Sequence, residues 1–180
     1  MQADYFRLCA LWAKGGVWID ADSRALRPLG PFIRSVGEGF LSMWDGKLQN
    51  HVIVSRARHD PFLGAAVELS TRHIEQRLQR SAYYVTGPRV LNLIWTAIDP
   101  LGAHADGNLR RNPDAPRSAE ARGVAALFPG ALDAFSKFTR AHDWQTNQWI
   151  MEVEDAAYKS TTADWRSWKG SIYRNRDGGA

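Results

Sequence analysis

The stretch KGGVWIDADSRAL (residues 14–26) places a glycine pair before a short apolar run that ends on two carboxylates, Asp20 and Asp22. The apolar residues 17–19 predict a short strand. Because alternate residues of a strand point to the same side, we expect both carboxylates to project together where the strand leaves its sheet. Mg²⁺ or Mn²⁺ typically takes one or two carboxylates together with water and substrate phosphate. The stretch therefore predicts half of a divalent metal site, with a solvated turn as the alternative for an isolated D-x-D.

The residues before this stretch predict a helix that could complete the site. Residues 2–14 have a helical apolar stripe, and the glycine pair is a typical helix stop. The helix rises about 15 Å from Asp4 onward, and the strand returns about 10 Å in the other direction. A reversal at the glycines would bring Asp20 and Asp22 back to Asp4 and Arg7, which share a helix face. Arg7 could then contact phosphate or sugar and Asp4 could accept sugar hydroxyls. The alternative is a surface ion pair between Asp4 and Arg7.

The rest of the chain has an α/β pattern that is strand-rich early and helical later. The expected elements are a hairpin of strands at 40–44 and 51–55, helices at 60–80 and 87–98, a loop at 99–117, and a mostly helical segment at 118–158. We expect one domain over residues 1–180, since the chain has the length of a single domain.

The composition is that of a soluble globular protein, with 44% apolar and 23% charged residues. The net charge of +4 comes from scattered arginines, which suits an anionic ligand such as a nucleotide diphosphate and does not indicate nucleic acid. The single cysteine, Cys9, fits a reducing compartment. No apolar run approaches the ~18 residues of a membrane span, and residues 1–16 lack the basic start and continuous apolar centre of a signal peptide. We therefore expect no transmembrane segment and a cytoplasmic protein, either unattached or peripheral at the inner face of a membrane.

Residues 3–26, ADYFRLCALWAKGGVWIDADSRAL, resemble a combined sequence signature, D-x-x-R followed by G-G-x-x-x-D-x-D. This is the signature of sugar-transferring enzymes with a DXD motif. They include the glycosyltransferase family 32 type, yeast initiating mannosyltransferases, bacterial capsular polysaccharide transferases and, more distantly, large clostridial glucosylating toxins. Weaker similarity continues in NHVIVSRARHDP (residues 50–61) and TGP (residues 86–88). AHDWQTNQW (residues 141–149) approximately matches the histidine and Ser-Trp pair that close the family's site.

The resemblance implies a partial GT-A fold, an α/β nucleotide-sugar transferase fold, with additional C-terminal helices. It implies transfer of a sugar from a nucleotide-diphosphate sugar to a glycan or other acceptor, with retention of configuration and with Mn²⁺ or Mg²⁺ as cofactor. Asp22 would bind the metal, Asp20 would hold the ribose or donor sugar, and Asp4 and Arg7 would orient the transferred sugar. The implied site residues fall into three roles: catalytic Asp20, Asp22 and Arg7; substrate-binding Asp4, Arg7, Asp20, Asn50 and Gly16; and metal-binding Asp22, Asp20 and His142.

One departure from the family concerns the start of the chain. Members carry several tens of residues before the D-x-x-R helix, including the first strand, which binds the nucleobase. We therefore expect residues 1–180 to be the larger, C-terminal part of a catalytic domain. One alternative is a truncated, inactive transferase-like binding module. A second is a haloacid dehalogenase-like phosphatase with Asp20 as nucleophile, although Arg24 stands where that motif has Thr or Val.

Overall fold

The fold is that of a computed structural model of the chain. The structure describes residues 2–36, 39–44, 47–78, 81–98, 123–124, 126–128, 138–142 and 150–152. In chain order the elements are α1 (Gln2–Lys14), β1 (Gly16–Ile19), β2 (Ser23–Ala25), α2 (Gly30–Ser35), β3 (Gly39–Trp44), β4 (Lys47–Ser55), α3 (Pro61–Glu75), α4 (Ala82–Val85), α5 (Pro88–Ile98), β5 (Phe138–His142) and β6 (Ile150–Glu152).

The main sheet has four strands in the order β1-β4-β3-β5. β1 and β3 both pair antiparallel with β4, whereas β5 pairs parallel with β3. β3 and β4 form a hairpin closed by the Trp44–Lys47 pair, with a register shift between Leu41 and Met43. A separate two-stranded sheet pairs β2 with β6. The sheet is therefore mixed, and the parallel pairing of β3 with β5 joins segments about a hundred residues apart.

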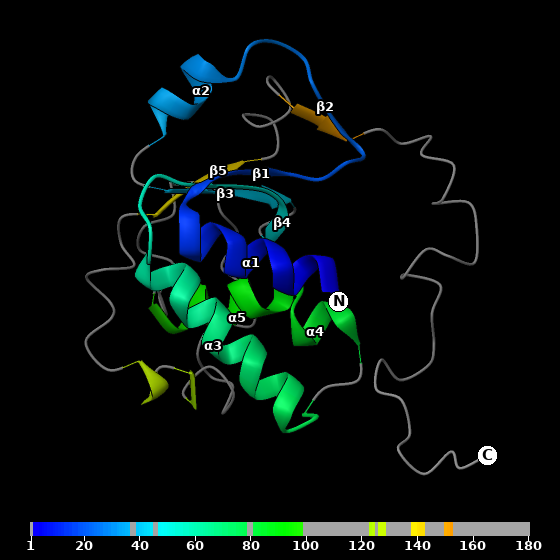
Figure 1. The fold of residues 1–180 in the computed structure, drawn as a ribbon, viewed down its shortest axis with the longest axis vertical. Coiled ribbons are helices and arrows are strands. Elements are labelled where there is room, and N and C mark those ends of the chain that lie inside the picture. The colour runs from blue at the N-terminus through cyan, green and yellow to red at the C-terminus, as the bar shows by residue number, and fades with distance from the viewer. Residues whose placement is uncertain are drawn as a thin grey trace, which may run out of the picture.

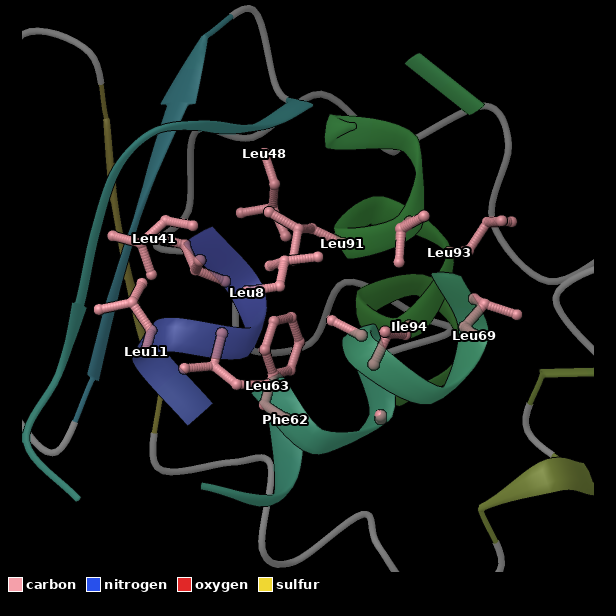
Figure 2. Close-up of a cluster of buried hydrophobic side chains, with 14 of the residues drawn as sticks. Leu8, Leu11, Leu41, Leu48, Phe62, Leu63, Leu69, Leu91, Leu93 and Ile94 are labelled. Atoms are coloured by element: carbon pink, nitrogen blue, oxygen red, sulfur yellow. The ribbon is translucent and has the colours of Figure 1, made fainter. Parts of the chain in front are cut away.

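Helices cover both faces of the main sheet (Figure 1). α1, α3 and α5 lie on one face and α2 lies over the other. The larger core fills the space between the sheet and the three helices (Figure 2); its members include Leu8, Leu11, Leu41, Leu48, Phe62, Leu63, Leu69, Leu91, Leu93 and Ile94. A smaller cluster under α2 joins Phe32 and Val36 to Val52 and Val54 of β4. β4 is thus an inner strand of the sheet that is buried on both faces, and β1 is held in place by pairing with it.

Local sequence explains where the main helices begin. Asp60 caps α3, since its Oδ1 accepts hydrogen bonds from the amides of Phe62 and Leu63 at 2.9 and 3.2 Å. Pro61 and Pro88 occupy the first positions of α3 and α5, where a missing N–H costs nothing. In α5 the Asn92 side chain reaches across to β4. It accepts from the Leu48 amide and donates to the Leu48 carbonyl, both at 2.9 Å.

Most of the elements expected in residues 2–98 are confirmed. α1, the strand before Asp20, the hairpin of β3 and β4, and α5 lie where their patterns predict. α3 ends at Glu75 instead of about residue 80, and Arg77 just beyond it has a positive φ of 50°. The pattern gave no sign of β2, α2 or α4. Among the described residues no helix is long and apolar enough to cross a bilayer.

The helical expectation for residues 118–158, and with it the additional C-terminal helices, is wrong in most of the described part. Residues 138–142 and 150–152 form β5 and β6. Both are short strands whose partners, β3 and β2, lie far away in the chain, so local periodicity does not reveal them. Only the short helical stretch around Val124 agrees with the expectation. The expected loop at 99–117 lies outside the described residues.

Candidate functional site

The chain reverses at the glycine pair between α1 and β1. Gly15 and Gly16 have φ values of +67° and +108°, which side-chain-bearing residues rarely adopt. The Gly15 amide donates to the Leu11 carbonyl at 2.7 Å and so closes the last turn of α1. A Cβ on Gly15 would lie only 3.1 Å from the Ser55 carbonyl oxygen. The predicted reversal is confirmed, and β1 runs back beside β4 toward the start of α1.

The reversal places Asp20 against the side chain of Arg7. Arg7 is 5% exposed, and its Nη1 lies 2.8 Å from Asp20 Oδ1. Its Nη2 lies 3.1 Å from Asp4 Oδ1, one helical turn away. Nη1 also donates to the backbone carbonyl of Asn50 in β4. A single buried guanidinium therefore joins α1, the end of β1 and the middle of β4.

Asn50 completes this arrangement from the β4 side. Its Nδ2 donates to Asp4 Oδ1 at 2.8 Å, so that oxygen is shared with Arg7. The Asp20 amide donates to the His51 carbonyl at 2.9 Å, which extends the pairing of the strands one residue past β1. We call Asp4, Arg7, Asp20 and Asn50 the Arg7 cluster. Its four members come from α1, from β4 and from the residue that follows β1, and they hold one another through charge-assisted hydrogen bonds.

Trp18 is a member of the same neighbourhood that the sequence analysis missed. Its Nε1 donates to Asp20 Oδ1 at 2.8 Å, and the Arg7 Cζ lies 5.1 Å from its ring centroid. The Phe6 ring meets Trp18 edge-on, with centroids 6.1 Å apart, and remains 63% exposed. Strand alternation was the available signal, because Trp18 lies two residues before Asp20 on the same strand face. Asp20 Oδ1 thus accepts from both a cation and an indole.

Burial raises the pKa of Asp20. Desolvation raises the pKa of Asp20 above its usual value of 3.8, and the nearby Asp22 carboxylate raises it further. Arg7, through its charge and its hydrogen bond, and the Trp18 hydrogen bond oppose this rise without cancelling it. Burial makes ionisation of this carboxyl group costly, and the hydrogen bonds from Arg7 and Trp18 stabilise its charged form. Each member of the Asp20–Arg7 pair therefore compensates the burial of the other's charge.

Asp22 lies in a turn. β1 ends at Ile19, and the Ser23 amide donates to the Asp20 carbonyl at 2.9 Å, which closes a turn over residues 20–23. The expectation that strand alternation aligns Asp22 with Asp20 is therefore wrong in its reasoning. The two carboxylates are nevertheless near enough to interact, as the pKa of Asp20 shows. Asp22 is partly exposed at the same end of β1.

Two other predicted site residues lie away from the Arg7 cluster. Gly16 pairs with Ser55 at the opposite end of β1, about 13 Å along the strand from Asp20. His142 is the last residue of β5, paired with Met43, and β5 and β1 are opposite edges of the main sheet. β4 and β3 therefore separate His142 from Asp20. The structure brings together Asp4, Arg7, Asp20 and Asn50, with Asp22 beside them.

The donor chemistry at the end of β1 fits part of a divalent cation site. Mg²⁺ and Mn²⁺ prefer carboxylate oxygens and keep several positions for water or phosphate. Asp22 is partly exposed in its turn and carries carboxylate oxygens of this kind, and Asp20 Oδ1 accepts from Arg7 and Trp18. Within the described ranges no three His, Cys, Asp or Glu side chains are grouped to hold a metal. The described residues therefore supply at most part of a cation's ligands, with Asp22 as the partly exposed carboxylate.

Comparisons with known solved structures add a distant likeness. No family model and no curated protein matches the chain. Among solved structures, the chain is similar to the PaToxG glycosyltransferase with 20% sequence identity and a TM-score of 0.44. That match covers 50% of this chain and 32% of the other, so the chain spans about a third of that structure's length. At this level the likeness decides nothing about activity.

Proposed function

We propose that the chain carries the sugar-binding part of a metal-dependent glycosyltransferase site. The observation that supports this most directly is the Arg7 cluster, in which one buried guanidinium holds Asp4 and Asp20 beside the Asp22 turn. A nucleotide-diphosphate sugar offers hydroxyls at one end and a diphosphate at the other. Carboxylates that are fixed in place suit the hydroxyls, and a carboxylate-bound cation suits the diphosphate.

Arg7 would act by positioning the two carboxylates. Its two Nη atoms contact Asp4, Asp20 and Asn50, and the residue is almost fully buried. Direct contact with substrate phosphate would require these bonds to break. We therefore assign it the task of fixing Asp4 and Asp20 so that their remaining acceptor capacity meets sugar hydroxyls in one orientation.

Asp22 would hold the metal, Mn²⁺ or Mg²⁺. When bound, the cation would neutralise negative charge that develops on the departing nucleoside diphosphate. Asp20 would contribute by binding the ribose or donor sugar next to that charge. Transfer to a glycan acceptor with retention of configuration is the outcome that the sequence resemblance implies, and the anomeric form of the product tests it.

The direct test is a panel of nucleotide-diphosphate sugars incubated with the chain, with Mn²⁺, Mg²⁺ or chelator, and with release of nucleoside diphosphate as the readout. We expect one donor to be hydrolysed or transferred only with a divalent cation present. Donor binding without turnover would favour the transferase-like binding module. No binding of any donor in the presence of Mn²⁺ would contradict the proposal.

The phosphatase alternative is tested in the same experiment. A dehalogenase-type enzyme would hydrolyse a generic phosphate ester and form a phosphorylated Asp20 that mass spectrometry detects. In the structure Asp20 Oδ1 is bonded to Arg7 and Trp18, so that oxygen would have to leave both donors before it could attack phosphorus. We expect no phosphoaspartate.

A further inference from the structure

A second surface of the chain lies at the other end of α1 and β1. It is formed by Lys14 at the end of α1 and by the connection between β4 and α3, where Arg56, Arg58 and His59 are all exposed. The His59 amide donates to the Trp12 carbonyl at 2.6 Å, and the two rings meet edge-on with centroids 4.9 Å apart. We call these five residues the basic end of the molecule.

The charge of the basic end is not neutralised by the described part of the chain. Among the described residues no carboxylate forms a salt bridge with Lys14, Arg56 or Arg58. Asp60 follows directly in sequence, but it is 5% exposed and its carboxylate is bonded to the first amides of α3. Three permanent cations therefore gather on one exposed surface, and a surface of this kind attracts an anionic partner.

Trp12 adds an aromatic ring that is fixed in place. A Cβ on Gly64 of α3 would lie 3.1 Å from Trp12 Nε1, so the indole lies directly against that helix. The residue is still 36% exposed beside His59. Trp side chains are enriched at the headgroup level of a bilayer, because the indole has an apolar ring and a polar N–H.

The basic end is separated from the Arg7 cluster. Lys14 is seven residues along α1 from Arg7, about 10 Å of helix, and Gly16 is at the opposite end of β1 from Asp20. Figure 1 shows the two ends of α1 and β1 on opposite sides of the molecule. A partner bound at the basic end would leave the Arg7 cluster uncovered.

We propose that the basic end binds the anionic headgroups of a lipid bilayer. Three neighbouring Lys and Arg side chains with one interfacial Trp match the chemistry of a negatively charged membrane surface. Single-stranded nucleic acid, the other common polyanion, is favoured by a basic groove lined with several stacking rings. Here one exposed indole accompanies the cations, and its ring is in edge contact with His59. The proposal is independent of transferase activity.

The test is co-sedimentation of the full chain with vesicles of phosphatidylcholine alone or with 30 mol% phosphatidylserine. We expect binding to the anionic vesicles only, weakening at least tenfold between low and high salt because the attraction is screened. Each basic side chain near such a surface raises the partition coefficient of the protein onto the membrane about fivefold. Arg56→Glu with Arg58→Glu should therefore weaken binding by more than about 20-fold. Lys47→Glu, at the far end of β4, is the control that also replaces a cation by an anion, and it should change binding less than about twofold.

Three outcomes would overturn the proposal. Equal binding to neutral and anionic vesicles would exclude an electrostatic site. An effect of Lys47→Glu as large as that of Arg56→Glu with Arg58→Glu would show that net charge and not the basic end decides. Failure to bind anionic vesicles at low salt would reject lipid, and binding of an oligothymidylate under the same conditions would then assign the surface to single-stranded nucleic acid. Circular dichroism of each variant checks that the fold is retained.

Discussion

Arg7 and Asp20 are thirteen positions apart in sequence, yet Nη1 of one lies 2.8 Å from Oδ1 of the other. The contact exists because α1 and β1 run in opposite directions from the glycine pair, with nearly cancelling lengths. It joins a helix to the end of a strand at a largely buried position. The ion pair is therefore part of the fold as well as part of the proposed site, and substitutions there should affect both.

Removal of Arg7 should destabilise the protein. Arg7→Ala would leave Asp4 and Asp20 close together without their shared cation, and their side chains are only 20% and 27% exposed. Breaking a buried ion pair by removing one partner costs about 3 kcal/mol or more. Urea unfolding measures this cost. Arg72→Ala removes an exposed pair with Glu68 and should cost about 0.5 kcal/mol or less, and equal effects of the two substitutions would contradict a structural role for Arg7.

The pH dependence of stability should change in Asp20→Asn. Because burial raises the pKa of Asp20 in the folded protein, its contribution to stability is fully present below about pH 3.8 and is lost as the pH rises through the folded-state pKa. The asparagine variant lacks this ionisation. The free energy of unfolding of the wild type, minus that of Asp20→Asn, should therefore fall as the pH increases above 3.8. Urea unfolding of both proteins across this range gives the difference, and a difference that rises with pH would be the opposite sign.

Asp22→Ala should remove the response to metal with little loss of stability. Asp22 is partly exposed in a turn, so its removal should cost less than about 1 kcal/mol. If Asp22 holds the cation, donor turnover and its dependence on Mn²⁺ should disappear together, by the ~10²-fold or more that deletion of one electrostatic stabiliser produces. Isothermal titration with Mn²⁺ gives a second readout. Unchanged Mn²⁺ affinity in a folded variant would move the metal elsewhere.

Asn92 should be essential for joining α5 to β4. Its side chain bonds both the amide and the carbonyl of Leu48, and it also donates to the Pro88 carbonyl at 2.8 Å. Asn92→Ala would leave two backbone groups of the buried Leu48 without this partner, at a cost of about 2 kcal/mol or more. Gln49→Ala, in the next residue of β4, is the control and should cost less than about 0.5 kcal/mol. Urea unfolding and amide exchange at Leu48 are the measurements.

The sequence predicted the parts of the site that depend on local signals. The apolar stripe and glycine stop of α1 gave the helix its bounds, and counting residues across the reversal brought Asp20 toward Arg7. The position of Asp22 was misjudged because strand alternation was carried one step past Ile19, where a turn begins. Trp18 was passed over because an apolar residue in a strand is usually core.

The C-terminal strands were beyond prediction for a different reason. β5 is stabilised by pairing with β3, and β6 by pairing with β2, each more than ninety residues away. Pairings of this kind depend on which distant segments meet and leave little trace in local periodicity. The parallel pairing of β3 with β5 is therefore seen in the structure but could not be predicted from the sequence.

The length of the two-glycine connection between α1 and β1 also determines which face of the sheet each residue of β1 occupies. Trp18 and Asp20 face the helices, while Ile19 belongs to the cluster under α2 on the opposite side. Insertion of a single residue after Gly16 would exchange these two faces along the whole strand if the pairing with β4 were kept. Ile19 would then take the place of Asp20 beside the guanidinium of Arg7, and Trp18 would take the place of Ile19 under α2. The number of residues between the D-x-x-R helix and the first aspartate is thus fixed by geometry, and the insertion of a single residue would separate Asp20 from Arg7.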